Sequence, residues 1–195
     1  MSGKIILSII LVFLFSGFYG GRPNTRNCNY PNSARGSSAQ DESYPFELLR
    51  YFEGNWSQVY KYWIYPGAEP FEESGNTENK IIMDKFLQMV SVSHQIIGGS
   101  VYTLQVIGYD SKLKQYFICD MDESGSNIIT AQGKYDESKD MFVLKGNENL
   151  AKGQKRYFEY LTKLISKDEY VCELYYTLPF GEKFKTMEIR NIRNK

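Results

Sequence analysis

Residues 101–145 decide the fold: VYTLQVIGYDSKLKQYFICDMDESGSNIITAQGKYDESKDMFVLK. Four stretches in which apolar and polar residues alternate are separated here by three short polar turns, Asp110–Lys112, Glu123–Ser126 and Asp136–Asp140. Alternation with a period of two predicts strands that bury one face. Turns of this length and composition join neighbouring strands as antiparallel pairs, so the segment predicts a meander of four strands.

The same pattern continues in both directions and predicts about ten strands. They cover approximately residues 56–63, 72–83, 86–94, 101–109, 115–121, 128–135, 141–145, 156–165, 170–177 and 184–192. Residues 44–52 carry apolar side chains at helical spacing, and Ser43 and Pro45 suit the cap and first turn of a short helix. We therefore predict an all-β fold, an up-and-down antiparallel barrel with a short helical segment before the first strand. A barrel is preferred to a sandwich because closure leaves no exposed edge strand.

The first residues predict a secretion signal. A basic start, Met1–Lys4, leads into the apolar run Ile5–Phe15 and then into small residues. We expect a signal peptide over residues 1–21, cleaved near Gly20 or Gly21, with an uncleaved signal anchor as the alternative. The apolar run is shorter than the roughly 20 residues that span a bilayer. The protein is therefore expected to be secreted or periplasmic, with no stable membrane span after cleavage.

The remaining chain divides into a linker and one domain. Residues 22–43 are rich in Asn, Ser, Pro and Gly and have no hydrophobic period, which is typical of a disordered linker. Residues 44–195 are long enough for a single barrel domain with one core. Basic and acidic residues balance at 23 each, so no field attracts nucleic acid, and we expect no nucleic-acid partner. The sequence does not indicate an oligomeric state.

A set of short motifs carries a resemblance to known barrels. Gly54 and Trp56 open the first predicted strand as in the Gly-x-Trp start of lipocalins. Further motifs follow in order at Asn79–Lys80, Phe86–Leu87, Gly108–Asp110, Tyr116, Asp122, Gly125, Gly133, Tyr135–Asp136, Gly181–Lys185, Met187–Ile189 and Arg193. Together they resemble a bacterial family known as domain of unknown function 1579. The resemblance implies a calycin-type barrel, usually exported or bacterial and without an established activity, in which Arg193 covers Trp56 at the closed end.

Four charged residues on or beside the strands are candidates for the barrel lumen. They are Lys85, Asp120, Arg156 and Glu188. Charged side chains inside a small barrel need partners or a polar ligand, so two or more of them facing inward would suit a small polar or anionic ligand. The alternative is that they face solvent, because one sequence does not fix the strand register.

Histidine and cysteine limit the chemistry. His94 is the only histidine, which excludes metal sites built from two or three histidines, and we expect no metal or cofactor. The resemblance to haem-binding ten-stranded barrels would need a histidine near the last strand, which residues 184–192 lack. Cys28, Cys119 and Cys172 are odd in number, so at least one is unpaired. Buried free thiols are expected, with a Cys28 tether to the barrel as the alternative.

Three functions remain open. The first is a carrier-type barrel that binds a small molecule. The second is an enzyme that uses Asp120 or Glu188 in the lumen as a general base, which would require a raised pKa. The third is a structural or interaction protein with a filled core. The sequence favours binding over catalysis. The lumen distinguishes the three functions: an open cavity favours binding, a buried carboxylate beside a basic residue favours catalysis, and a filled core favours a structural role.

Overall fold

The computed structural model describes residues 39–95, 99–125, 128–150 and 154–195. The predicted signal peptide, its cleavage sites at Gly20 and Gly21, most of the predicted linker and Cys28 lie outside the described residues. The helices in the described part of the chain lack the length and apolar character that a bilayer span requires.

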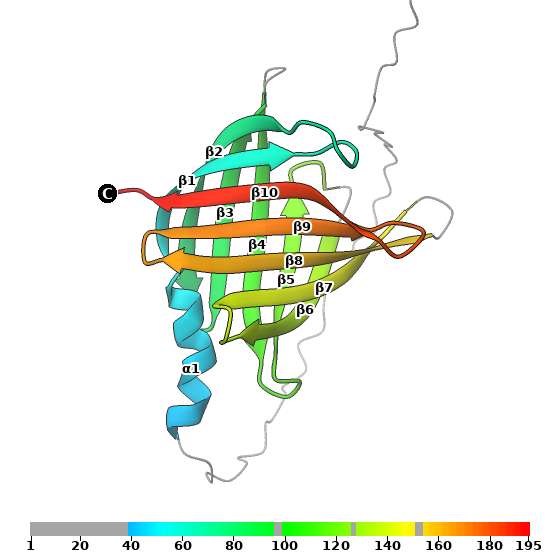
Figure 1. Ribbon diagram of the computed structural model, residues 1–195. Helices are drawn as coiled ribbons and strands as arrows, with labels where there is room; N and C mark the ends of the chain where they lie inside the picture. Colours follow the sequence, from blue (N-terminus) through cyan, green and yellow to red (C-terminus); the bar gives the residue numbers. More distant parts are fainter. Residues whose placement is uncertain (1–38, 96–98, 126–127, 151–153) are drawn as a thin grey trace, which may run out of the picture. The chain divides into compact units, whose positions relative to one another are not determined.

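In the described part of the chain, ten antiparallel strands close into a barrel, preceded by one helix (Figure 1). Each strand pairs with its sequence neighbours, and the first strand pairs with the last to complete the ring. The elements are α1 (Ala39–Arg50), β1 (Gly54–Tyr62), β2 (Phe71–Ile82), β3 (Phe86–His94), β4 (Ser100–Asp110), β5 (Gln115–Asp122), β6 (Ile128–Asp136), β7 (Met141–Asn149), β8 (Lys155–Ser166), β9 (Glu169–Thr177) and β10 (Lys183–Arg193). The predicted fold class is confirmed.

β7 is four residues longer than predicted. The sequence pattern ends the seventh strand at Lys145, before Gly146, whereas β7 continues to Asn149. Gly146 does not mark a turn. A Cβ atom there would lie 2.3 Å from the Thr130 carbonyl oxygen and 2.5 Å from the Phe158 ring, so this glycine allows a close approach inside the sheet.

The helix begins at Ala39, earlier than the predicted Tyr44. The predicted roles of Ser43 as cap and Pro45 as first-turn residue are wrong, because both lie within α1. A proline inside a helix leaves one carbonyl without its backbone donor, so local rules favour a helix that begins at the proline. Packing at the barrel end outweighs that preference, since Leu49 of α1 is completely buried.

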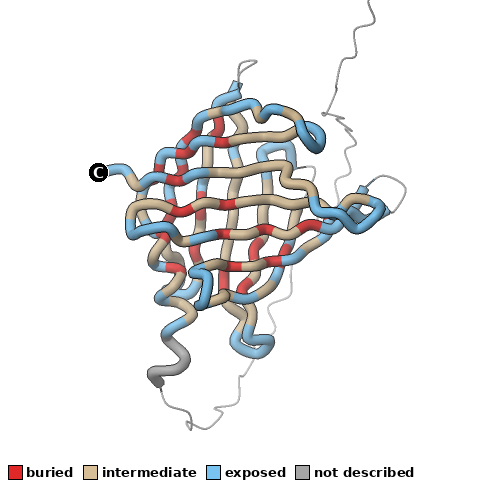
Figure 2. Tube along the Cα trace, viewed as in Figure 1, coloured by how far each residue is buried: buried red, intermediate tan, exposed pale blue. Residues whose placement is uncertain are grey.

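Buried and exposed residues alternate along the strands, as Figure 2 shows. In β1, Trp56, Gln58 and Tyr60 are buried, while Ser57 and Val59 between them are exposed. This is the period-two pattern of a strand with one face toward a lumen. The inner face of each strand can therefore be identified from its buried members.

β10 departs from this alternation at a β-bulge near its start. Phe184 pairs with Tyr176 and Met187 pairs with Leu174, so three steps along β10 correspond to two along β9. The extra residue reverses which face the following side chains occupy. Glu188 therefore lies on the outer face, although simple alternation from Phe184 would place it inside.

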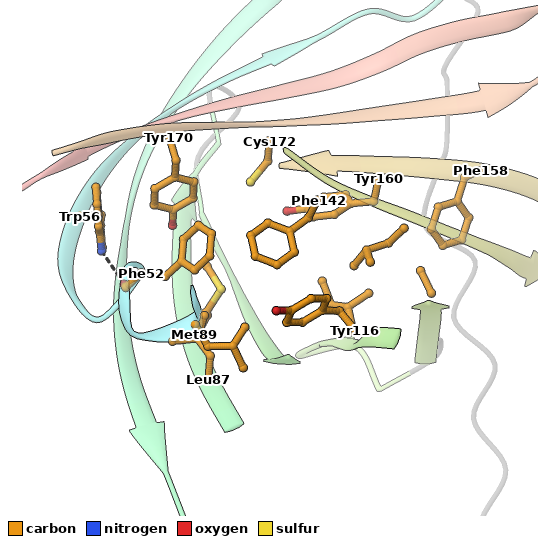
Figure 3. Close-up of a cluster of buried hydrophobic side chains, with 14 residues drawn as sticks. Phe52, Trp56, Leu87, Met89, Tyr116, Phe142, Phe158, Tyr160, Tyr170 and Cys172 are labelled. Carbon is orange, nitrogen blue, oxygen red and sulfur yellow. Dashed lines mark hydrogen bonds between the residues drawn. The ribbon is translucent and has the colours of Figure 1, made fainter. Parts of the chain in front are cut away.

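The hydrophobic core fills the end of the barrel that α1 covers. Figure 3 shows the aromatic side chains of this core, which come from several strands and from the segment after α1. The Tyr170 ring lies edge-on to Phe52 and Trp56, with centroid distances of 4.9 Å and 4.7 Å, and Phe142 lies edge-on to Tyr116 at 4.9 Å. The indole nitrogen of Trp56 donates to the Phe52 carbonyl at 2.8 Å. These contacts pack the aromatic side chains closely at this end of the barrel.

Arg193 closes the same end from outside. Its guanidinium lies 4.0 Å from the centroid of the Trp56 ring, a cation–π contact worth roughly 0.5–2 kcal/mol. The guanidinium also donates to the backbone carbonyls of Glu53 (2.5 Å), Tyr51 (2.8 Å) and Lys167 (3.1 Å). Arg193 thus joins the last strand, the segment after α1 and the turn between β8 and β9, which is a structural role.

Candidate functional site

The half of the barrel away from α1 encloses a cavity of about 290 Å³. Side chains of β1, β3–β6 and β8–β10 line it. A second void of about 20 Å³ lies deeper, among Leu49, Phe52 and Phe142 of the core. The barrel is therefore filled at the end that α1 covers and hollow toward the other end.

The cavity has a polar wall and an apolar wall. Most of the polar side chains come from β1 and β3–β5: Gln58, Ser91, Ser93, Thr103, Gln105 and Asp120. The wall with more apolar residues comes from β8–β10, where Phe158, Leu174, Met187 and Ile189 line the cavity beside Tyr160, Tyr176 and Asn191. We call it the apolar wall. A lining of this kind suits a small molecule that carries both an apolar body and a polar group.

Deep in the cavity, polar side chains bond to one another. The Tyr60 hydroxyl donates to Oε1 of Gln58 at 2.7 Å, and Nε2 of Gln58 donates to Oδ1 of Asn191 at 2.9 Å. Asn191 in turn donates to the Ile189 carbonyl at 3.1 Å. Burial raises the pKa of Tyr60, so its hydroxyl stays protonated and keeps its role as donor. These groups are satisfied internally, and they fix the shape of the cavity floor.

Asp120 lines the cavity on β5. Its Oδ2 accepts a hydrogen bond of 2.5 Å from Nε2 of Gln105, the residue directly opposite on β4. Burial raises the pKa of Asp120, the Gln105 hydrogen bond lowers it, and the nearby Asp122 raises it. The net effect is a raised pKa. Asp120 is thus a desolvated carboxyl group whose strand partner is an amide rather than a base.

Arg156 lies at the open end of the barrel, where its side chain is 44% exposed. It forms an ion pair with the buried Glu148, and its guanidinium lies 3.9 Å from the centroid of the Tyr176 ring. Burial and the Glu148 carboxylate raise the pKa of Tyr176 to about 12. Arg156 is held by its neighbours at the rim and is not among the described residues that line the cavity.

Two further candidates lie outside the lumen. Lys85 is exposed in the turn between β2 and β3, at the α1 end. Glu188 lies on the outer face, where Lys185 donates to its carboxylate at 2.5 Å and to Glu173 at 2.6 Å. Of the four charged residues singled out in the sequence, Asp120 alone lines the cavity in the described part of the chain.

Several lining residues were not singled out from the sequence. Gln58 and Tyr60 carried a usable signal, because they share a face of β1 with Trp56 under period-two alternation. Gln105 carried none. Its position matters only because it stands opposite Asp120 in the pairing of β4 with β5.

The two cysteines that the structure describes and the histidine lie on three different strands, β5, β9 and β3. Cys172 is buried in the lumen and Cys119 is half-buried on β5, and both are free thiols. Burial raises the pKa of the Cys172 thiol, so it stays protonated. His94 is exposed and contacts the Ser100 hydroxyl at 3.1 Å. Among the described residues, no three His, Cys, Asp or Glu side chains are close enough together to hold a metal ion.

Comparison with known proteins gives a family without a known function. The family described as "Protein of unknown function (DUF1579)" matches residues 42–193. The chain is similar to the crystal structure of Rv2717c from M. tuberculosis, with 14% identity and a TM-score of 0.57 over 77% of this chain and 98% of that one. A de novo designed fluorescence-activating β-barrel shows 12% identity and a TM-score of 0.44 over 75% and 97% of the two chains. No curated protein matches. At these identities the structural likeness shows the fold alone.

Proposed function

Because the chain belongs to the DUF1579 family, whose function is unknown, we propose a function from the lumen: a carrier-type barrel that binds a small ligand. The observation that carries the proposal is the cavity of about 290 Å³ with one polar and one apolar wall. This is about twice the volume of a ~150 Å³ protein cavity that accepts benzene. The cavity has room for a small organic molecule.

The same cavity argues against the two alternatives. A structural barrel would have a filled core along its whole length, whereas only the end near α1 is filled here. A lumen enzyme would need a positioned base with a partner. Asp120 has an amide as its hydrogen-bond partner, and Glu188 lies on the outer face. Binding is the activity that this geometry supports best.

Export is part of the proposal. It rests on the apolar run Ile5–Phe15 and the small residues that follow it. A ligand carrier in the periplasm or outside the cell would be purified as a mature chain that begins near Gly21. The mass of the intact protein measures this directly.

Native mass spectrometry of the protein purified from its own compartment tests the binding function. We expect a retained small-molecule adduct, and we expect Ser91→Phe to abolish it, because position 91 on β3 points into the cavity. Val90→Phe is the matched control, since Val90 is the preceding residue on the outer face and is 39% exposed. Thr103→Phe, on β4, provides a second filling variant if Ser91→Phe folds poorly.

The outcome against the proposal is equally specific. An unliganded mass for the wild-type protein, together with no saturable binding of 4-phenylbutan-1-ol or of its ammonium and carboxylate counterparts in calorimetric titration, would exclude a binding cavity. An adduct that survives in both filling variants would place the ligand elsewhere.

A further inference from the structure

The charge of the cavity lining has one sign. Asp120 and Asp122 are among the lining residues, and the described part of the lining contains no Lys, Arg or His. Arg156, a cation that the sequence made a candidate for the lumen, is paired with Glu148 at the rim. A negative, partly desolvated cavity attracts a cationic ligand and repels an anionic one.

Asp120 has the geometry of a receptor for a positive group. Oδ2 accepts from Gln105 at 2.5 Å, which holds the carboxylate in place from the neighbouring strand. No described residue donates to Oδ1, so that oxygen is left for a donor in the cavity. The second carboxylate, Asp122, is exposed at the end of β5, where its Oδ1 accepts from Ser124, whereas Asp120 is half-buried. Asp120 is therefore the anchoring carboxylate.

Aromatic side chains complete the surroundings of a cation. Five lining residues present rings to the lumen: Tyr60, Tyr62, Phe158, Tyr160 and Tyr176. The Tyr176 ring already holds the Arg156 guanidinium at 3.9 Å, and aromatic faces next to a carboxylate recognise ammonium ligands in the same way. The Tyr60 and Tyr62 rings are stacked nearly parallel, with centroids 6.0 Å apart.

We infer that the cavity binds an amphipathic organic cation, with its ammonium group paired to Asp120 and its apolar body against the wall formed by β8–β10. The inference rests on the proposed function and adds the ligand class to it. It replaces the expectation of a polar or anionic ligand, which required two or more of the four charged candidates in the lumen. The cavity contains one of them, and it is an acid.

Three probes that differ only in their polar group test the inference by calorimetric titration of the purified full chain: 4-phenylbutylammonium, 4-phenylbutan-1-ol and 4-phenylbutanoate. A charge-assisted hydrogen bond contributes about 10- to 100-fold in affinity. We expect the ammonium probe to bind about 10- to 100-fold more tightly than the alcohol, and the carboxylate to bind more weakly than both.

Asp120→Asn identifies the anchoring group. It keeps the size of the side chain and an oxygen acceptor for Gln105, and it removes the charge. We expect it to lower the affinity for the ammonium probe much more than the affinity for the alcohol, and a cooperative thermal unfolding transition shows that the variant is folded. Glu188→Gln is the matched control on the outer face, and the preference for ammonium should persist in it.

The pH profile gives an independent readout. Ammonium binding should weaken as the pH falls through the pKa of Asp120, which burial raises, whereas alcohol binding should change much less because no ion pair is lost. The titratable groups that act on Asp120 are Asp122, Tyr60 and Tyr160. Both tyrosines have raised pKa values and stay neutral, so they contribute no charge change over this range.

The results separate the inference from the function on which it rests. Three results would overturn the cationic ligand class: equal affinities for the three probes, a preference for the carboxylate, or a preference for ammonium that persists in Asp120→Asn. Each of them would still be consistent with a barrel that binds small molecules. Absence of binding by all three probes would contradict the binding function itself.

Discussion

At the scale of single residues, Gly54 and Arg193 depend on each other. Gly54 is the first residue of β1 and has a backbone φ of +119°, a conformation that residues other than glycine rarely adopt. A Cβ atom there would lie 2.9 Å from Nη1 of Arg193, the nitrogen that donates to the Glu53 carbonyl. Glycine at this position therefore allows the backbone to turn into β1 and leaves space for the guanidinium of Arg193.

Gly54→Ala is expected to destabilise the protein by about 1–3 kcal/mol, from backbone strain and from displacement of Arg193. Gly67→Ala is the matched control, because Gly67 also has a positive φ, of +84°, but has no atom within 4 Å of an added Cβ. Urea unfolding measures both variants. Equal losses in the two would mean that the contact with Arg193 adds nothing to the backbone strain.

At the scale of elements, α1 covers one end of the barrel and packs against the core there. Leu49 is fully buried and Phe52, just after the helix, is 3% exposed, whereas Glu47 on the same helix has a side chain 63% exposed. The helix could be expected from the apolar spacing in the sequence. The first residue of the helix could not be predicted in this way. The position of Pro45 within α1 follows from packing against the barrel rather than from the local preference of proline for the first turn of a helix.

Leu49→Ala should lower the free energy of unfolding by about 2–5 kcal/mol, because it enlarges the small void beside Phe52 that little else can fill. Glu47→Ala on the exposed face of α1 should change the unfolding midpoint much less. Thermal and urea unfolding provide the comparison. A loss below about 1 kcal/mol for Leu49→Ala would mean that α1 is not required to close the core.

At the scale of the whole molecule, one half of the barrel contains the packed core and the other contains the candidate site. The closed end contains the aromatic core and the Arg193 contacts, while the open half contains a cavity and a desolvated carboxyl group. Sites that need unfilled space and buried charge generally reduce stability. Asp120 is the residue at which this cost can be measured.

Asp120→Asn is expected to raise the melting temperature at pH 7. Burial raises the pKa of Asp120, so between the ordinary value of 3.8 and the raised value the native protein binds more protons than the unfolded chain. Stability therefore falls as the pH rises through the raised pKa, and the charge is unfavourable above it. The advantage of Asp120→Asn should shrink as the pH approaches 3.8.

Glu188→Gln is the control for this measurement, since its carboxylate accepts from Lys185 at 2.5 Å and its removal should bring no gain. A wild-type protein that is more stable than Asp120→Asn at pH 7 would show that the Asp120 charge is favourably solvated in the free cavity. That result would contradict the desolvated carboxylate described above.

The sequence by itself determined the approximate number of strands, their order and the turns between them, because alternation and turn chemistry act over a few neighbouring residues. The contact of Trp56 with Arg193 was expected from the resemblance to a known family. The tertiary structure alone decided which side chains share the lumen. The bulge in β10 turned Glu188 outward, close approach kept Gly146 inside β7, and strand register placed Gln105 opposite Asp120. Each of these three placements depends on contacts between strands, and no local sequence pattern specifies such contacts. The fold could therefore be predicted from the sequence, whereas the sign of the charge in the cavity could not.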